Sequence, residues 1–232
     1  MNLKETKTIG TICYLGNLPF VFQDFCYSWS KMVEFNATHM PGRIDYQVIK
    51  VSELSHARDL AAKNMKGEFL LMIDADNSFE PDLAFNMLNL MKKFTIPVLT
   101  GVYLLKTEPH SPVIYSYDKD ADKYRPLKGW KEDMTGKIFQ IGASGAGCLM
   151  IRRDVFNVIE QELKETPFGI YKNYGEDISF FDRLRRLDIP VFCSTDVTVN
   201  HLMSHPLTIG VDYNPVLKNQ DKNTGFKAKG LV

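Results

Sequence analysis

The stretch FLLMIDAD at residues 69–76 decides the fold that this chain is expected to adopt. Its first five residues are all apolar, as in a central strand of a parallel sheet, which is covered on both faces. Two carboxylates, Asp74 and Asp76, follow directly, so they are expected at the carboxyl end of the strand, where ligands of such sheets bind. The stretch therefore predicts a buried strand that leads into a polar site.

The Asp-x-Asp pattern itself has two readings. Mg²⁺ and Mn²⁺ prefer hard oxygen ligands and neutralise phosphate oxygens, so the pair fits a site for a metal and a nucleotide diphosphate. Alternatively, the pair is a turn or a helix start, because Ser78 and Pro81 follow it. The position directly after a buried strand favours the metal site.

Strand and helix signals alternate on both sides of this stretch. In the first half, strands are expected at 8–15, 46–51, 69–73 and 98–105, and helices, one opened by Pro19 and one capped by Ser55, at 19–33, 55–65 and 81–93. In the second half we expect a hairpin or loop excursion at 111–136, strands at 148–152, 190–193 and 197–201, and helices at 154–164 and 176–187. This order predicts an α/β fold with a Rossmann-like, mostly parallel central sheet and helices on both faces.

The composition narrows the class of protein. The 232 residues fit one domain, predicted over 1–213 with halves 1–105 and 106–213, and a polar tail follows at 214–232. Lys+Arg and Asp+Glu number 28 each, which argues against a dedicated phosphate-backbone binder. No apolar run could form a transmembrane segment. The four scattered cysteines are expected to be free thiols, mostly buried, which favours a cytoplasmic location.

Two carboxylates and a histidine in the second half are further candidates. Glu176 and Asp177 open a helix, where acids are stabilised by the helix dipole, but a carboxylate at such a fixed position could also accept a proton. His201 ends a predicted strand and is either structural or, with Asp76, part of a mixed oxygen and imidazole metal site. His205 is a weaker candidate for the same role.

Two more features remain open. The small residues at 142–147 either let a substrate approach the backbone or pack a strand tightly. Arg58, near the start of a predicted helix, either contacts a base, ribose or phosphate or covers the helix surface.

Taken together and in this order, these stretches resemble glycosyltransferases of the GT-A fold, close to the small soluble members of family 2. The resemblance covers about residues 8 to 205 and rests on IGTICYLG, Ala57-Arg58, LLMIDADNSFEPD, IPVLTGVYLLKTEPHSPVIY, GAGCLMIRRDVF, YGEDISFFDRLRRLDIPVF and the late Val199–His201. The resemblance implies a nucleotide-sugar-binding half before residue 105 and an acceptor half after it.

The resemblance also implies residue roles. Asp76 and His201 would bind Mn²⁺ or Mg²⁺, and Asp177 would be the base that deprotonates the acceptor hydroxyl, with Glu176 beside it. The donor, a UDP-sugar first among nucleotide-diphosphate sugars, would be bound by Thr11, Cys13, Arg58, Asp74 and Ala75. Asp59 stands where these proteins commonly carry Asn.

Other functions remain alternatives. A nucleotidyltransferase would use the same sheet and metal, although the loop at 16–19 lacks the basic residue that such enzymes often carry there. A non-catalytic nucleotide- or sugar-binding module would not need all of the carboxylates and the histidine. The acceptor could be a glycan, a lipid-linked sugar, a protein or a modified nucleic-acid base.

Overall fold

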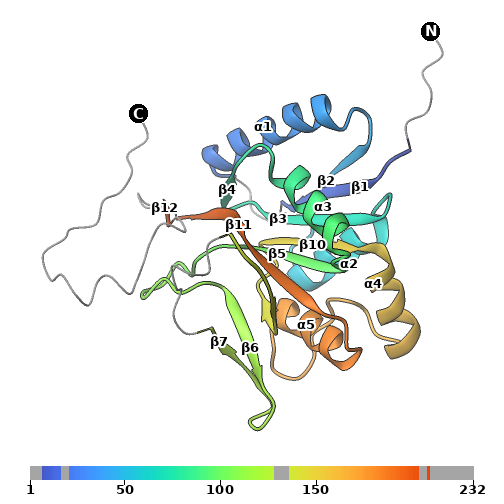
Figure 1. Cartoon of the computed structure of the whole chain (residues 1–232), viewed down its shortest axis with the longest axis vertical. Helices are drawn as coiled ribbons and strands as arrows, with labels where there is room; N and C mark the ends of the chain where they lie inside the picture. Colours follow the sequence, from blue (N-terminus) through green and yellow to red (C-terminus); the bar gives the residue numbers. More distant parts are fainter. Residues whose placement is uncertain (1–6, 17–20, 128–135, 204–207, 210–232) are drawn as a thin grey trace, which may run out of the picture.

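The computed structural model describes residues 7–16, 21–127, 136–203 and 208–209. Its main sheet has nine strands, seven of which run in the order β12-β11-β5-β10-β3-β1-β2, while β4 and β8 pair with β11 (Figure 1). The strands are β1 (Gly10–Leu15), β2 (Ile44–Ile49), β3 (Phe69–Asp74), β4 (Asn77–Phe79), β5 (Val98–Val102), β8 (Ile138–Ile141), β10 (Cys148–Arg152), β11 (Val191–Leu202) and β12 (Thr208–Ile209).

The sheet is largely parallel, in two groups. Strands β2, β1 and β3 run parallel to one another, and β11 runs parallel to β5. Strand β10 separates the two groups and is antiparallel to both of its neighbours, β3 and β5. The predicted 148–152 strand is thus confirmed, while its reversed direction makes the sheet mixed.

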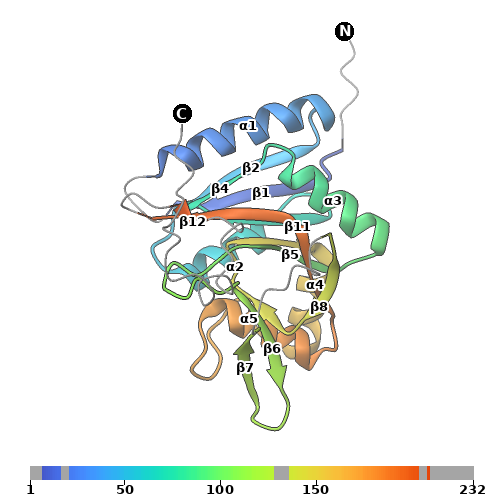
Figure 2. The ribbon, with the colours of Figure 1, turned by 60° about the vertical axis from the view of Figure 1, so that its left-hand side comes forward.

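Helices cover both faces of the sheet, as predicted (Figures 1 and 2). Side chains of α1 (Gln23–His39) and α3 (Leu83–Phe94) share one core cluster, which includes Phe25, Met87 and Leu71 of β3. Side chains of α2 (Leu54–Asn64), α4 (Arg153–Val158) and α5 (Glu176–Arg186) share the other, with Leu70 of β3. The alternating residues of β3 therefore enter two different cores, which explains why all of them are apolar.

Several predicted boundaries need correction. The helix expected from Pro19 begins at Gln23, and residues 17–20 lie outside the described part of the chain. Helix α2 begins at Leu54, so its N-cap is Glu53 rather than Ser55, and the Ser55 hydroxyl donates to Glu53 Oε1 at 2.8 Å. The two strands expected at 190–193 and 197–201 are one strand, β11, whose pairing with β5 is irregular between them. The helix expected at 154–164 is α4 followed directly by a π-helical turn, Ile159–Leu163.

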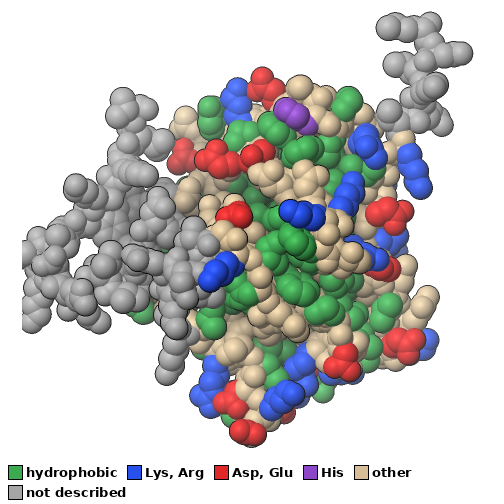
Figure 3. Space-filling view, in the orientation of Figure 1, with side chains coloured by type: hydrophobic (Ala, Val, Ile, Leu, Met, Phe, Trp, Pro, Cys, Tyr) green, Lys and Arg blue, Asp and Glu red, His purple; other side chains and the backbone are tan. Residues whose placement is uncertain are grey.

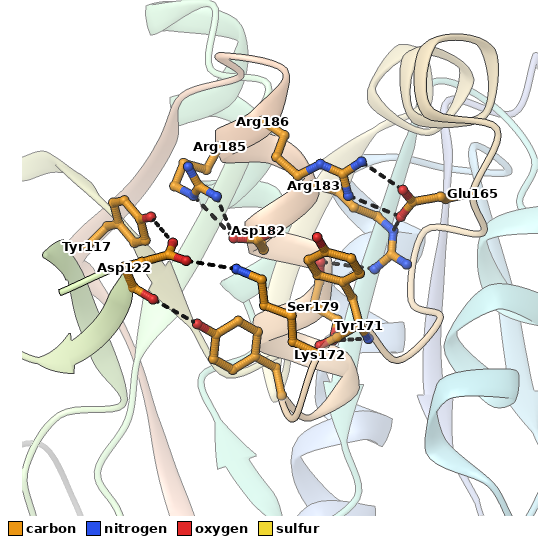
Figure 4. A network of polar contacts seen from close by, with 11 residues as sticks. Tyr117, Asp122, Glu165, Tyr171, Lys172, Ser179, Asp182, Arg183, Arg185 and Arg186 are labelled. Atoms are coloured by element: carbon orange, nitrogen blue, oxygen red, sulfur yellow. Dashed lines mark hydrogen bonds and ion pairs between the residues drawn. The ribbon is translucent and has the colours of Figure 1, made fainter. Parts of the chain in front are cut away.

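The predicted excursion contains a hairpin of β6 (Ile114–Asp118) and β7 (Lys123–Pro126), which joins β9 (Ala143–Ser144) in a second sheet. A polar network fastens this hairpin to α5 and to the loop before it (Figure 4). Asp122 bonds the Tyr117 hydroxyl and the Lys172 ammonium, and Glu165 forms ion pairs with Arg183 and Arg186 of α5. The network therefore fixes the helix whose first turn carries Glu176 and Asp177.

Three expectations concern the whole chain. All four cysteines are free, and three of them are buried, as predicted. None of the helices in the described ranges is long and apolar enough to cross a bilayer. On the face shown in Figure 3, basic and acidic side chains are interspersed rather than gathered by sign, which agrees with the balanced charge of the sequence.

Candidate functional site

The candidate site lies at the carboxyl end of β3. Asp74 is the last residue of this strand and is level with Leu15, the last residue of β1. The chain then turns into β4, which pairs antiparallel with β11, so Asn77 lies opposite His201. The Leu202 N–H donates to the Asp76 carbonyl at 2.6 Å. This pairing brings His201 to Asp76, two residues far apart in the sequence.

Asp76, His201 and Lys106 converge on one oxygen atom. His201 Nε2 lies 3.4 Å from Asp76 Oδ2, and Lys106 Nζ lies 2.6 Å from the same oxygen. His201 Nδ1 lies 2.8 Å from the Leu104 carbonyl oxygen, which can only accept, so Nδ1 carries a proton and Nε2 is the ring nitrogen that faces Asp76. Nε2 can donate to this carboxylate when it carries a proton, and when it does not, the imidazole nitrogen and the carboxylate oxygen are two ligand atoms that suit a cation between them.

The charged form of the Asp76 carboxyl is strongly favoured over its protonated form. Burial by itself would raise the pKa of this carboxyl, but bonds from His201 and Lys106 lower the pKa to about 2. The group is therefore an anion throughout the physiological range, as a metal ligand must be.

Arg58 connects Asp74 to Glu176 below the surface. Only 3% of its side chain is exposed, and it donates from Nη2 to Asp74 Oδ1 at 3.1 Å and from Nε to Glu176 Oε1 at 3.3 Å. A third bond joins Nη1 to the Ala146 carbonyl at 3.3 Å. Burial would lower the pKa of Arg58, but the two carboxylates raise it. Arg58 thus acts within the protein and positions both acids.

Asp177 lies in the first turn of α5, one residue after Glu176. Burial raises its pKa, a bond from the Ile178 N–H to Oδ1 at 2.7 Å lowers it, and the charge of Glu176 raises it again, with a net increase. The charge of Asp74 is close enough to contribute to the raised pKa of Asp177. A carboxylate with a raised pKa beside a sheet edge is suited to accept a proton from a substrate.

The glycine-rich stretch at 142–147 packs tightly against the site. A Cβ at Gly145 would lie 2.0 Å from the Tyr103 hydroxyl oxygen, and one at Gly147 would lie 3.1 Å from Asp74 Oδ2. The Gly147 N–H donates to the Tyr103 hydroxyl at 3.2 Å, and the Tyr103 ring meets the His201 ring edge-on. Of the two readings of this stretch, the structure supports tight packing.

The other predicted donor-binding residues do not join this group. Thr11 lies four residues before the end of β1, fully buried, and bonds Asp45 Oδ2 at 3.2 Å and the Lys66 N–H at 2.7 Å. Cys13 is also fully buried, and burial raises its pKa to about 12. Ala75 packs partly against the core. His205 lies outside the described residues.

Asp59, the departure from the family pattern, has a structural partner. Its Oδ1 accepts the Phe168 N–H at 2.7 Å, and burial raises its pKa. The carboxylate thus holds the loop before α5 against α2. It does not point to a donor contact.

Asp76 and His201 supply some of the ligand atoms that a divalent metal needs. Adjacent ligands of an octahedral ion held at ~2.1 Å are about 3 Å apart, close to the 3.4 Å between Asp76 Oδ2 and His201 Nε2. In the described part of the chain, no group of three or more His, Cys, Asp or Glu side chains could hold a metal ion. The two residues would therefore need oxygens from a bound ligand or from water to complete a coordination sphere.

Sequence reasoning missed two residues of this site, Lys106 and Tyr103. Both lie at the end of the strand predicted at 98–105, which ends at the same sheet edge as β3. A lysine directly after an apolar strand is a signal for such a position that the sequence does contain.

No protein-family model matches the chain, and a search of curated protein sequences finds no match. Among solved structures, the crystal structure of A197 from STIV is similar, with a TM-score of 0.57 and 16% identity over 90% of this chain and 92% of that one. The crystal structure of GalNAc-T7 with UDP, GalNAc and Mn²⁺ has a TM-score of 0.56 and 12% identity over 90% of this chain. The match covers 47% of that longer chain, so this protein spans about half its length. These similarities confirm a fold of the GT-A glycosyltransferase type.

Proposed function

We propose that this chain is a metal-dependent glycosyltransferase that moves a sugar from a nucleotide-diphosphate sugar to a hydroxyl group of an acceptor. The observation that carries the proposal is the convergence of Asp76 Oδ2 and His201 Nε2 at the carboxyl end of β3. Its fold supports the proposal, because open α/β sheets bind ligands beyond the carboxyl ends of their strands. The bound UDP and Mn²⁺ of GalNAc-T7 lead us to propose a UDP-sugar and Mn²⁺, with Mg²⁺ as the alternative metal.

On the donor side, Asp76 and His201 would hold the metal, and residues 1–105 would bind the nucleotide. When bound, the cation would neutralise the negative charge that develops on the departing diphosphate. Asp74, whose Oδ1 is held by Arg58, would accept hydrogen bonds from the ribose with its other oxygen. Ala75 would lie beside it, whereas Thr11 and Cys13 are fully buried and could affect the donor only through their neighbours.

On the acceptor side, we assign Asp177 as the base. The acceptor oxygen attacks the anomeric carbon, the bond from that carbon to the diphosphate oxygen breaks, and the acceptor proton passes to Asp177. A single displacement of this kind inverts the configuration of the sugar. Glu176 would act through its ion pair with Arg58, which keeps the first turn of α5 beside Asp74.

The proposal is tested by thermal shifts with UDP, GDP, CDP and ADP, each with and without Mn²⁺. A diphosphate present at ~100 times its dissociation constant should stabilise the wild type by about 2.7 kcal/mol. We expect one diphosphate to do so only with Mn²⁺ and only when Asp76 is intact, so Asp76→Asn should lose the shift. Asp82→Asn is the matched control, because this aspartate at the start of α3 makes no capping hydrogen bond.

Failure of every nucleotide to shift the wild type would contradict the proposal. With the donor class identified, the products separate it from its alternatives. Release of the nucleoside diphosphate from a nucleotide sugar supports a glycosyltransferase, and release of pyrophosphate from a nucleoside triphosphate supports a nucleotidyltransferase. Binding without turnover of any acceptor would favour a binding module.

A further inference from the structure

The ammonium group of Lys106 lies against Asp76, one of the two residues that we assign to the metal. Its Nζ lies 2.6 Å from Asp76 Oδ2, the same oxygen that faces His201 Nε2 at 3.4 Å. The side chains of Lys106 and Asp76 are 34% and 27% exposed, so the pair is partly shielded from solvent. Because like charges repel, an ammonium and a divalent cation cannot share this oxygen at contact distance without a large cost.

The backbone that carries Lys106 is held in place. The Leu105 N–H donates to the Ser111 carbonyl at 2.9 Å, and His110 Nδ1 lies 2.9 Å from the Leu105 carbonyl. These bonds close the loop immediately after Lys106. The ammonium can therefore leave Asp76 by rotation of its four-carbon stem, without a movement of the loop.

We propose that Lys106 makes the binding of the metal and the binding of the donor diphosphate depend on each other, an inference that rests on the proposed function. Without ligands, the ammonium neutralises Asp76 and competes with the metal. When the metal takes Asp76, the ammonium is released toward the diphosphate, which a lysine binds as a point charge. The coupling is reciprocal, because each ligand changes the affinity of the other by the same factor.

The test measures binding rather than activity. Mn²⁺ binding is followed by the loss of the free-ion electron paramagnetic resonance signal, and UDP binding at saturating Mn²⁺ by calorimetry. Lys106→Met should bind Mn²⁺ alone about tenfold more tightly and UDP about tenfold more weakly, because a tenfold change is typical of one charge-assisted hydrogen bond. Lys66→Met is the matched control, since Lys66 pairs with Asp45 elsewhere and its loss should change neither affinity.

Opposite changes in the two affinities are the signature of coupling, because a lysine that merely stabilised the fold would not tighten the metal. If Lys106→Met leaves Mn²⁺ affinity unchanged or weakens it, while the wild type binds Mn²⁺ through Asp76, the inference on Lys106 is overturned and the proposed function stands. If Asp76→Asn binds Mn²⁺ as tightly as the wild type does, the inference on Lys106 and the proposed function are both overturned. Thermal unfolding of each variant confirms that it is folded.

Discussion

Replacing Asp76 by Asn in the metal-free protein should lower the free energy of unfolding at neutral pH and change its dependence on pH. Lys106 and His201 lower the pKa of Asp76 from 3.8 to about 2. At about 1.36 kcal/mol for each pKa unit, this corresponds to ~2.4 kcal/mol, and partial exposure of the side chain reduces the expected value to about 1–2 kcal/mol. Asp76→Asn removes this contribution.

The sign follows from the lowered pKa. Because the folded state binds the proton of Asp76 less readily than the unfolded state, the contribution is present above the ordinary pKa of the carboxyl. It is lost as the pH falls through about 2. The difference in stability between wild type and Asp76→Asn should therefore shrink as the pH falls below the ordinary pKa of the carboxyl.

Urea denaturation in the presence of a chelator, followed by circular dichroism, measures this difference at each pH where both proteins unfold cooperatively. Asp82→Asn serves as the control and should give a smaller difference, because this side chain makes no capping hydrogen bond. A difference for Asp76→Asn that stays constant or grows as the pH falls would refute the electrostatic account of this residue.

Three further predictions concern the surroundings of the site. Arg58→Met should reduce the free energy of unfolding by about 2–4 kcal/mol in urea denaturation, because it leaves two partly buried carboxylates without their cation; an unchanged stability would contradict this. Gly145→Ala should cost about 1–3 kcal/mol, since its Cβ would lie 2.0 Å from the Tyr103 hydroxyl. Tyr103→Phe in the same chain should restore part of that loss, and purely additive effects in the double-mutant cycle would argue against the clash. Asp177→Asn should lower turnover by about 10²–10⁴-fold while leaving nucleotide-induced thermal shifts intact. Full activity of this variant would exclude Asp177 as the base. Asp177→Asn should also be at least as stable as wild type at pH 7, because the raised pKa of Asp177 means that its charged form destabilises the fold there.

The order of strands and helices could be predicted because each element has a local cause. The five apolar residues of β3 need cover on both faces, and the structure supplies it from two separate cores. The direction of β10 could not be predicted, because an apolar strand has the same local pattern in either direction. Its reversal depends on where the long excursion before it returns to the sheet.

The positions of site residues at strand ends could be predicted from the sequence, whereas the contacts made by residues in loops could not. Asp74 follows β3 directly, and its position needs only the direction of that strand. Thr11 lies four residues before the carboxyl end of β1 and is fully buried, and a motif match does not measure either property. The position of Lys106 directly after an apolar strand indicates the edge of the sheet at which it lies, but its pairing with Asp76 joins distant segments and has no pattern of its own in the sequence.

The reversed strand β10 has a consequence for how this protein could diversify. Thr100 of β5 and Leu149 of β10 are direct neighbours, so the chain between these strands starts and finishes at adjacent points of the sheet. Within this segment the β6–β7 hairpin closes on itself, because the Leu127 N–H donates to the Ile114 carbonyl at 2.8 Å. The length and sequence of the hairpin can change through evolution, or by grafting, while β8 keeps its pairing with β11 and Lys106 its contact with Asp76. On the proposed function, acceptor preference can then be exchanged between relatives while the chemistry of the donor is inherited unchanged.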